Sequence, residues 1–135
     1  VLSERVYQKL RASMPELRPV RFSNGDLYPS NFVVRDRGLV AVIDFANASC
    51  SDPVFEFLLA FFCHPELRGR GIEERFCALV GVDPAVLPWY RVLEFYDLWG
   101  YLAGTEDAFA GYDAGKVRSI LEHWERTGEL IRGRD

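Results

Sequence analysis

Two carboxylates and one amide are the side chains in this sequence whose types and spacing could do chemistry. Asp26 and Asn31 lie in the segment NGDLYPSN, and Asp44 follows in VAVIDFANASCSDP. Carboxylate and amide oxygens are hard ligands of the kind that Mg²⁺ binds, at about 2.1 Å. A carboxylate can also accept the proton of an attacking hydroxyl as a positioned base. These residues predict a Mg²⁺ site made by Asn31 and Asp44, with Asp26 as the base beside it.

A β-hairpin over residues 32–45 would bring these side chains together. The apolar runs FVVRD and LVAVIDF flank Arg37-Gly38, a pair typical of a tight turn. A two-residue turn at this point pairs Asn31 with Asp44, and directly opposed Cα atoms lie about 4.5–5.5 Å apart. A bulge at Gly38 would shift this register by one residue.

Turn formation is a second interpretation of the same residues. Asn-Gly-Asp is a common turn sequence, and Asp44 could close a turn or cap a helix without binding a cation. The spacing of Asp26 and Asn31 alone leaves both interpretations open.

The two segments together resemble the catalytic region of the aminoglycoside phosphotransferase and choline kinase family, relatives of the protein kinases. That family has the loop HGDxxxxN, then a hairpin, an I-D-[FW] motif and a D-P pair that opens a helix; residues 20–60 follow this order. The resemblance implies that Asp26 is the base or hydroxyl-positioning residue. It implies that Asn31 and Asp44 bind the Mg²⁺ that bridges the phosphates of ATP. Asp52, before Pro53, would brace the loop.

The sequence departs from the family pattern in two ways. Asn24 stands where the family usually has His, and its amide would support the loop through similar hydrogen bonds. The chain also lacks a Gly-rich phosphate loop, and its two lysines, Lys9 and Lys116, both fall in predicted helices. We therefore expect the C-terminal lobe of a protein-kinase-like fold, with the N-terminal lobe absent.

The pattern along the chain indicates a mainly α fold with a small β-hairpin. Helical periodicity runs from Leu2 to the stop at Pro15, and a catalytic loop over 24–31 precedes the hairpin. Helices are expected through 53–130. We predict a single domain over residues 1–135, with a core formed by large apolar side chains, namely Phe57, Leu58, Phe61, Phe62, Leu93 and Trp99.

Composition excludes several classes of protein. Apolar residues make up 49% of the chain, which predicts a packed core, and the net charge of −4 argues against a nucleic-acid-binding surface. Three cysteines without CxxC spacing indicate a reducing compartment. We find no signal peptide and no apolar run near membrane-spanning length, so we expect a cytoplasmic protein without membrane or nucleic-acid partners.

Taken together, these features predict the catalytic and substrate-binding lobe of an ATP- and Mg²⁺-dependent small-molecule kinase that phosphorylates a hydroxyl. The isolated chain should be inactive, because half of the ATP-binding groups would come from the missing N-terminal lobe. The alternative is a non-catalytic kinase-like binding or regulatory domain. Glu56, an acid in an otherwise apolar segment, is a candidate for substrate binding. The hairpin surface that would face the missing lobe should be apolar and could drive self-association.

Overall fold

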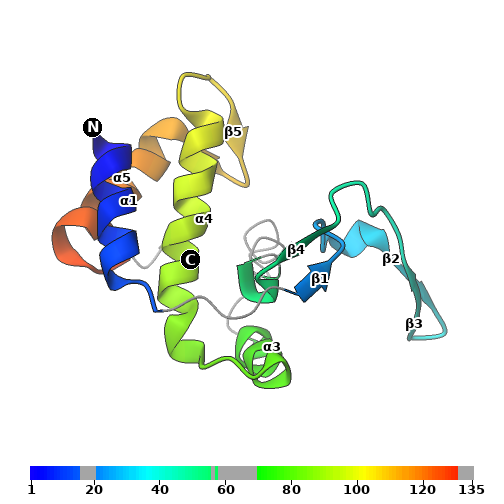
Figure 1. Cartoon of the computed structure of the whole chain (residues 1–135). Helices are drawn as coiled ribbons and strands as arrows, with labels where there is room; N and C mark the ends of the chain where they lie inside the picture. The colour runs from blue at the N-terminus through cyan, green and yellow to red at the C-terminus, as the bar shows by residue number, and fades with distance from the viewer. Residues whose placement is uncertain (16–20, 56, 58–69, 131–135) are drawn as a thin grey trace. The chain divides into compact units, whose positions relative to one another are not determined.

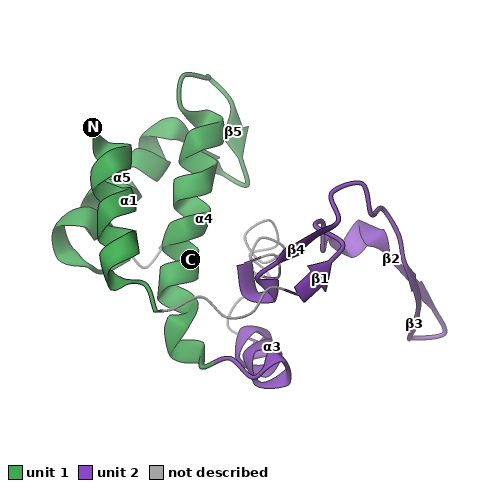
Figure 2. Ribbon diagram, in the orientation of Figure 1, with its two compact units in different colours: residues 1–16, 83–135 green, residues 17–82 purple. Residues whose placement is uncertain are grey.

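The computed structural model describes residues 1–15, 21–55, 57 and 70–130. The chain divides into two compact units, which Figure 2 shows in separate colours. The first, here called the helical unit, comprises residues 1–16 and 83–135. The second, here called the hairpin unit, comprises residues 17–82.

Three α-helices that pack against one another make up most of the helical unit (Figure 1). Helix α1 spans Leu2–Ser13, α4 spans Leu87–Leu102 and α5 spans Ala114–Thr127. The short elements of this unit are the 3₁₀-helix η3 and two two-residue strands, at Pro84–Val86, Ala108–Phe109 (β5) and Tyr112–Asp113 (β6).

Helical spacing of apolar residues explains how these helices pack. Leu2, Val6 and Leu10 are the buried residues of α1, as their four-residue spacing predicts. On α5 the buried side chains are Val117, Leu121 and Trp124. On α4 the buried positions are Leu87, Tyr90, Val92, Glu94, Leu98 and Leu102.

Two core predictions on α4 are wrong. Leu93 and Trp99 are only partly buried, whereas the preceding residues Val92 and Leu98 are buried. Helix α4 is apolar on most of its surface, so periodicity did not identify the side that faces α1 and α5. The predicted core residues Leu58, Phe61 and Phe62 lie outside the described residues.

Among its described residues, the hairpin unit holds four strands, the α-helix α3 and part of a further helical segment. The strands are β1 (Arg21–Ser23), β2 (Phe32–Arg35), β3 (Gly38–Val42) and β4 (Ser49–Ser51). The 3₁₀-helix η1 (Pro29–Asn31) precedes β2, and α3 spans Ile72–Val80. Residues 53–55 and 57 are also helical.

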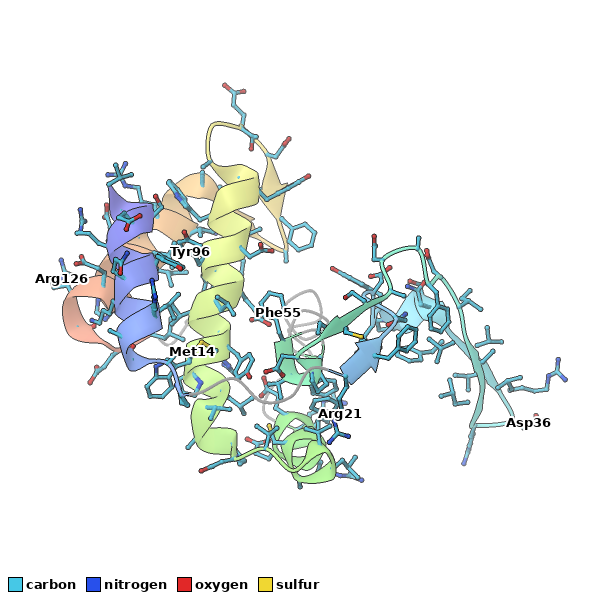
Figure 3. The ribbon with its side chains drawn as sticks, in the orientation of Figure 1. Met14, Arg21, Asp36, Phe55, Tyr96 and Arg126 are labelled. Atoms are coloured by element: carbon cyan, nitrogen blue, oxygen red, sulfur yellow. The ribbon has the colours of Figure 1, made fainter. Side chains whose placement is uncertain are left out.

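The β2–β3 hairpin turns one residue earlier than predicted. Its two-residue loop is Asp36-Arg37, with φ angles of 50° and 65°, and Figure 3 shows Asp36 at the tip of the hairpin. Two consecutive positive φ angles match a type I′ turn, whose twist suits antiparallel strands. Gly38 thus begins β3 and takes no part in the turn.

The register next to the turn consequently differs from the prediction by two residues, because Val34 pairs with Leu39. The ladder is irregular between Val33 and Val34, and beyond that point, where Phe32 pairs with Val42, the difference is one residue. Continuing outward, the backbone N–H of Ile43 donates to the carbonyl oxygen of Asn31 at 2.9 Å. Asn31 therefore lies opposite Ile43, and Asp44 follows one position later.

The fold class is as predicted, mainly α with small antiparallel strand pairs. Among the described residues no single helix is long and apolar enough to cross a membrane.

Candidate active site

The predicted catalytic loop lies in an opening between two short β ladders. Strand β1 pairs with β4 and β2 pairs with β3, both antiparallel, so residues 21–51 form one long hairpin with an unpaired middle. One side of this opening is residues 24–31 and the other is residues 43–48. The sequence did not predict the β1–β4 pair. It closes the opening at the end away from the β2–β3 turn.

Asp26 and Asn31 are joined by direct hydrogen bonds. The Nδ2 of Asn31 donates to the Oδ2 of Asp26 at 2.8 Å and to the backbone carbonyl of Asp26 at 2.9 Å. Both acceptors are oxygens, so the amide must present nitrogen to Asp26. The carbonyl oxygen Oδ1 of Asn31 is thus the atom of this buried side chain that can bind a cation.

The carboxylate of Asp26 keeps one oxygen available. Its Oδ2 is held by Asn31, while Oδ1 accepts no hydrogen bond from the residues that the structure describes. The side chain is partly buried, so its orientation is limited but water and small molecules can reach it. An oriented carboxylate with one open oxygen can accept a proton from a hydroxyl placed beside it.

Asn24 links the two sides of the opening. Its Nδ2 donates to the backbone carbonyl of Asp26 at 3.1 Å and to that of Asp44 at 3.5 Å. Its Oδ1 accepts from the backbone N–H of Asp26 at 3.3 Å. The side chain is buried. These contacts are the kind of loop support that the sequence predicts for Asn24.

Asp44 has an unusual backbone conformation. Its φ of 60° lies in the left-handed region, which Asp tolerates better than most residues. The Oδ1 of Asp44 accepts from the backbone N–H of Ala46 at 3.3 Å, forming a local turn. The residue is exposed, and the turn uses one oxygen of its carboxylate. Asp44 therefore forms a turn, as the second interpretation predicts, and its Oδ2 remains available to a cation.

Gly25 and Asn47 touch across the opening, and sequence reasoning missed this contact. A Cβ on Gly25 would lie 2.0 Å from the backbone oxygen of Asn47, and Gly25 has a φ of 76°. Only glycine fits this position. The Asn-Gly pair in NGDLYPSN was a signal for a positive φ at Gly25, but nothing in the sequence indicated its partner.

The other predicted site residues lie outside the opening: Asp52 is beyond the β1–β4 ladder, and Glu56 is not among the described residues. Asp52 follows β4, and its Oδ1 accepts from the backbone N–H of Val54 at 2.9 Å, which caps the helical segment after Pro53. Asp52 thereby connects the β1–β4 ladder to that segment. Glu56 lies outside the described residues.

Both lysines of the chain have structural contacts in the helical unit. The Nζ of Lys9 donates to the carbonyls of Trp124 and Glu125 at 2.9 and 2.7 Å and lies 5.0 Å from the centre of the Trp124 ring. The Nζ of Lys116 donates to the carbonyl of Gly111 at 2.8 Å. Both are helical, as predicted.

The donor set of the opening suits Mg²⁺ better than a softer metal. Among the described residues no three His, Cys, Asp or Glu side chains gather as metal ligands. The available atoms are instead one amide oxygen and one carboxylate, from Asn31 and Asp44. Mg²⁺ is commonly held by one or two such protein oxygens together with substrate phosphates and water.

Comparison with known proteins identifies the family. A model of the phosphotransferase enzyme family matches residues 1–91, a range that includes the whole opening and both ladders. No curated protein and no solved structure matches the chain significantly. The match covers more than half of the chain and confirms the resemblance that the two motifs indicate. The chain belongs to the phosphotransferase enzyme family.

Proposed function

We propose that this chain carries the catalytic residues of an ATP- and Mg²⁺-dependent kinase that phosphorylates a hydroxyl of a small molecule. In this reaction the hydroxyl oxygen bonds to the γ-phosphorus of ATP and the bond from that phosphorus to ADP breaks. The hydroxyl proton passes to the carboxylate of Asp26. Family membership supports the phosphoryl-transfer class, and the hydrogen-bond network around Asp26 supports its assignment as the base.

The observation that carries the proposal is the orientation of Asp26 and Asn31. One amide fixes one oxygen of the carboxylate and leaves the other open, so the base has a defined direction. Phosphoryl transfer depends mainly on positioning and charge stabilisation, and a base held in one orientation meets the first requirement.

Asn31 and Asp44 would hold Mg²⁺ through amide and carboxylate oxygens. When bound, the cation would supply positive charge to the phosphate oxygens of ATP. Asn31 is suited to this role because its Nδ2 atom is committed to Asp26. Asp44 is suited because its side chain is exposed beside the same opening.

The apolar surface of the hairpin supports the proposal that a second protein element binds to it. Several large apolar side chains between residues 22 and 45 are exposed, namely Phe22, Val33, Val34, Leu39, Val40, Ile43 and Phe45. An isolated two-stranded hairpin is only marginally stable, and exposed apolar strands favour association. We propose that a nucleotide-binding lobe covers this surface, and that the chain self-associates at high concentration when it is bare.

Phosphate binding also requires a contribution from that lobe. Lys9 and Lys116 are engaged with backbone carbonyls, so neither serves as the phosphate-binding lysine typical of kinases. This observation favours a second candidate function, a non-catalytic kinase-like binding or regulatory domain. The two candidates differ in whether the opening supports phosphoryl transfer.

The test is an assay of this chain with ATP, Mg²⁺ and a panel of hydroxyl compounds, alone and with a kinase-family nucleotide-binding lobe added in trans. We expect turnover only when the lobe is added. Asp26→Asn should then lower turnover about 10²–10⁴-fold, the usual contribution of a base, with ATP binding retained.

Two variants complete this assay. Asp44→Ala should lose Mg²⁺-dependent nucleotide binding as well as turnover, whereas Asp36→Asn at the hairpin tip should behave like the wild type. Near-normal turnover by Asp26→Asn would remove its role as the base. Nucleotide binding without turnover in every combination would support the non-catalytic alternative.

A further inference from the structure

A pocket in the helical unit lies where α1 ends, α4 begins and α5 ends. The three helices pack against one another (Figure 1). The pocket has a volume of about 180 Å³ and is lined by Lys9, Ser13, Pro88, Trp89, Trp124 and Gly128. An apolar cavity of about 150 Å³ can hold one benzene molecule. The pocket is therefore large enough for one aromatic ring with a small substituent.

Two indole rings are among the walls of this pocket. Trp124 on α5 is buried, whereas Trp89 on α4 is only partly buried. Aromatic rings pack favourably against one another in stacked or edge-to-face arrangements. A flat aromatic molecule is therefore the shape of ligand that these walls favour.

The nitrogen atoms that line the pocket are hydrogen-bond donors. The Nζ of Lys9 donates to the carbonyls of Trp124 and Glu125, and an ammonium has three N–H bonds, so one remains for a ligand. The Nε1 of Trp89 donates to the Oγ of Ser13 at 3.4 Å, a long contact that a better acceptor can replace. These donors suit a ligand that carries hydrogen-bond acceptors.

Gly128 leaves space beside the ammonium of Lys9. It follows α5 with a φ of 78°, the conformation of a glycine that ends a helix. A Cβ at this position would lie 3.8 Å from the Nζ of Lys9, so a larger side chain would occupy the space next to the charge. The glycine that ends α5 thus also keeps the ammonium accessible.

The charge around the pocket is positive. A larger cavity of about 690 Å³ adjoins it, and the two share Pro88, Trp89 and Gly128. The charged side chains that line the two cavities are Lys9, Arg91 and Glu129, two cations and one carboxylate. The whole chain, by contrast, has a net charge of −4. Charge complementarity therefore favours an anionic ligand here.

We propose that the helical unit binds a small aromatic carboxylate in this pocket, with its ring against Trp89 and Trp124 and its carboxylate on the Nζ of Lys9. The larger cavity would hold any further part of the molecule. All of the lining residues belong to the helical unit, so the site does not depend on the proposed phosphoryl transfer.

Helix capping is the competing explanation for Lys9. A lysine near the C-terminus of a helix binds the last carbonyls and interacts favourably with the helix dipole without any ligand. Capping accounts for the two carbonyl contacts of Lys9, but it predicts no affinity for an aromatic acid. A binding measurement therefore separates the two explanations.

The probe is benzoate, added to the full 135-residue chain and followed by NMR of the indole N–H signals of its three tryptophans. We expect saturable shifts of the Trp89 and Trp124 signals with a Kd of about 1 mM, a usual value for so small a ligand. Trp99 lines neither cavity, so its signal should not move. The absence of saturable shifts at Trp89 and Trp124, or equal shifts at all three, would overturn the proposal.

Two further probes test the chemistry of the ligand. Benzyl alcohol keeps the ring but lacks the charge, and it should bind about ten-fold more weakly than benzoate. Cyclohexanecarboxylate keeps the charge but lacks the aromatic ring, and it should bind several-fold more weakly. Equal affinity for either compound would overturn the proposal of an aromatic carboxylate and indicate a different occupant.

Lys9→Met tests the residue that would hold the carboxylate. It should lower the affinity for benzoate about ten-fold. Lys116→Met is the matched control, because the Nζ of Lys116 also donates to a backbone carbonyl, that of Gly111 at 2.8 Å, but lines neither cavity. Its affinity for benzoate should equal that of the wild type.

Circular dichroism checks that both lysine variants are folded. If Lys9→Met does not fold, Trp89→Ala decides, because it removes only a partly buried ring and should also lower the affinity about ten-fold. Unchanged affinity in folded Lys9→Met, or in Trp89→Ala, would overturn the proposal. An equal loss of affinity in Lys116→Met would overturn it as well.

Discussion

The helical unit and the hairpin unit bury different kinds of side chain. In the helical unit the buried residues are almost all apolar, with Val6, Leu102 and Leu121 fully enclosed. Among the described residues of the hairpin unit, Val54 and Cys77 are buried together with the polar Asn24, Asn31 and Glu73. Two of those polar residues belong to the candidate site. The buried residues of the helical unit thus form an apolar core. In the hairpin unit, the buried amides of Asn24 and Asn31 form hydrogen bonds with the carboxylate residues of the candidate site.

Backbone conformation shows the same division. In the helical unit the positive φ angles are at Ala110 and at glycines, in the β5–β6 turn and at helix ends. In the hairpin unit Asp36, Arg37 and Asp44 also have positive φ angles, and Asp44 is a candidate site residue. Strain away from regular turns is a frequent property of functional sites.

Truncation of the helical core should give the largest loss of stability. Leu121→Ala removes a fully buried side chain from α5 and should lower the free energy of unfolding by about 2–5 kcal/mol. Leu79→Ala on α3 is the matched control, because Leu79 is 85% exposed and its loss should change stability by less than about 0.5 kcal/mol. Urea denaturation followed by circular dichroism measures both. Equal losses of stability in the two variants would show that Leu121 is not part of the packed core.

A methyl group at Gly25 should be nearly as costly and should also abolish activity. Gly81→Ala, with a φ of 72° and no neighbour within 4 Å, should lose only the roughly 1–2 kcal/mol of left-handed strain. Gly25→Ala adds a collision with the Asn47 backbone, worth about 1–3 kcal/mol more. Denaturation and the trans-complemented kinase assay separate the two variants. If they are equally stable, the two sides of the opening do not touch.

Two aspartates that cap helical segments, one in each unit, can be compared directly. Asp113 accepts from the backbone N–H of Lys116 at 2.8 Å, and Asp52 accepts from that of Val54 at 2.9 Å. Either change to Ala should cost about 1 kcal/mol of stability. Only Asp52→Ala should also lower kinase activity, because Asp52 connects the β1–β4 ladder, which closes the opening, to the helical segment that follows. Unchanged activity in Asp52→Ala would reduce its role to capping.

The hairpin turn should give the smallest effect. Arg37→Gly relieves a φ of 65° in a residue with a side chain and suits a type I′ turn. We expect a change in stability of less than about 1 kcal/mol, in the stabilising direction, and no change in activity. A loss of activity would mean that the turn itself contacts a substrate or partner.

The sequence predicted the family better than the geometry of the candidate site. The motifs selected Asp26, Asn31 and Asp44, whose roles stay predictions, and they indicated the family that the comparison confirms. The register could not be obtained, because Arg37-Gly38 and Asp36-Arg37 are both acceptable turns and the irregularity at Val33 and Val34 leaves no sequence signal.

Contacts between residues far apart in the sequence could not be predicted either. Strand Ser49–Ser51 pairs with Arg21–Ser23, but its polar sequence did not predict a strand. The sequence predicted Asn24 as a loop support but did not predict its hydrogen bond to the backbone carbonyl of Asp44. The spacing of the three site residues was informative, but the opening that holds them was not predictable from local pattern.

The position of the β2–β3 turn divides the candidate site between two halves of the chain. A cut between Asp36 and Arg37 would leave Asp26 and Asn31 on one polypeptide and Asp44 on the other. Neither piece would contain all three candidate site residues. Each piece would carry one strand of each of the two ladders. The turn is thus a suitable point for a split-protein reporter, in which recovery of the proposed phosphoryl transfer, assayed with the nucleotide-binding lobe present, would signal that two fused partners had met.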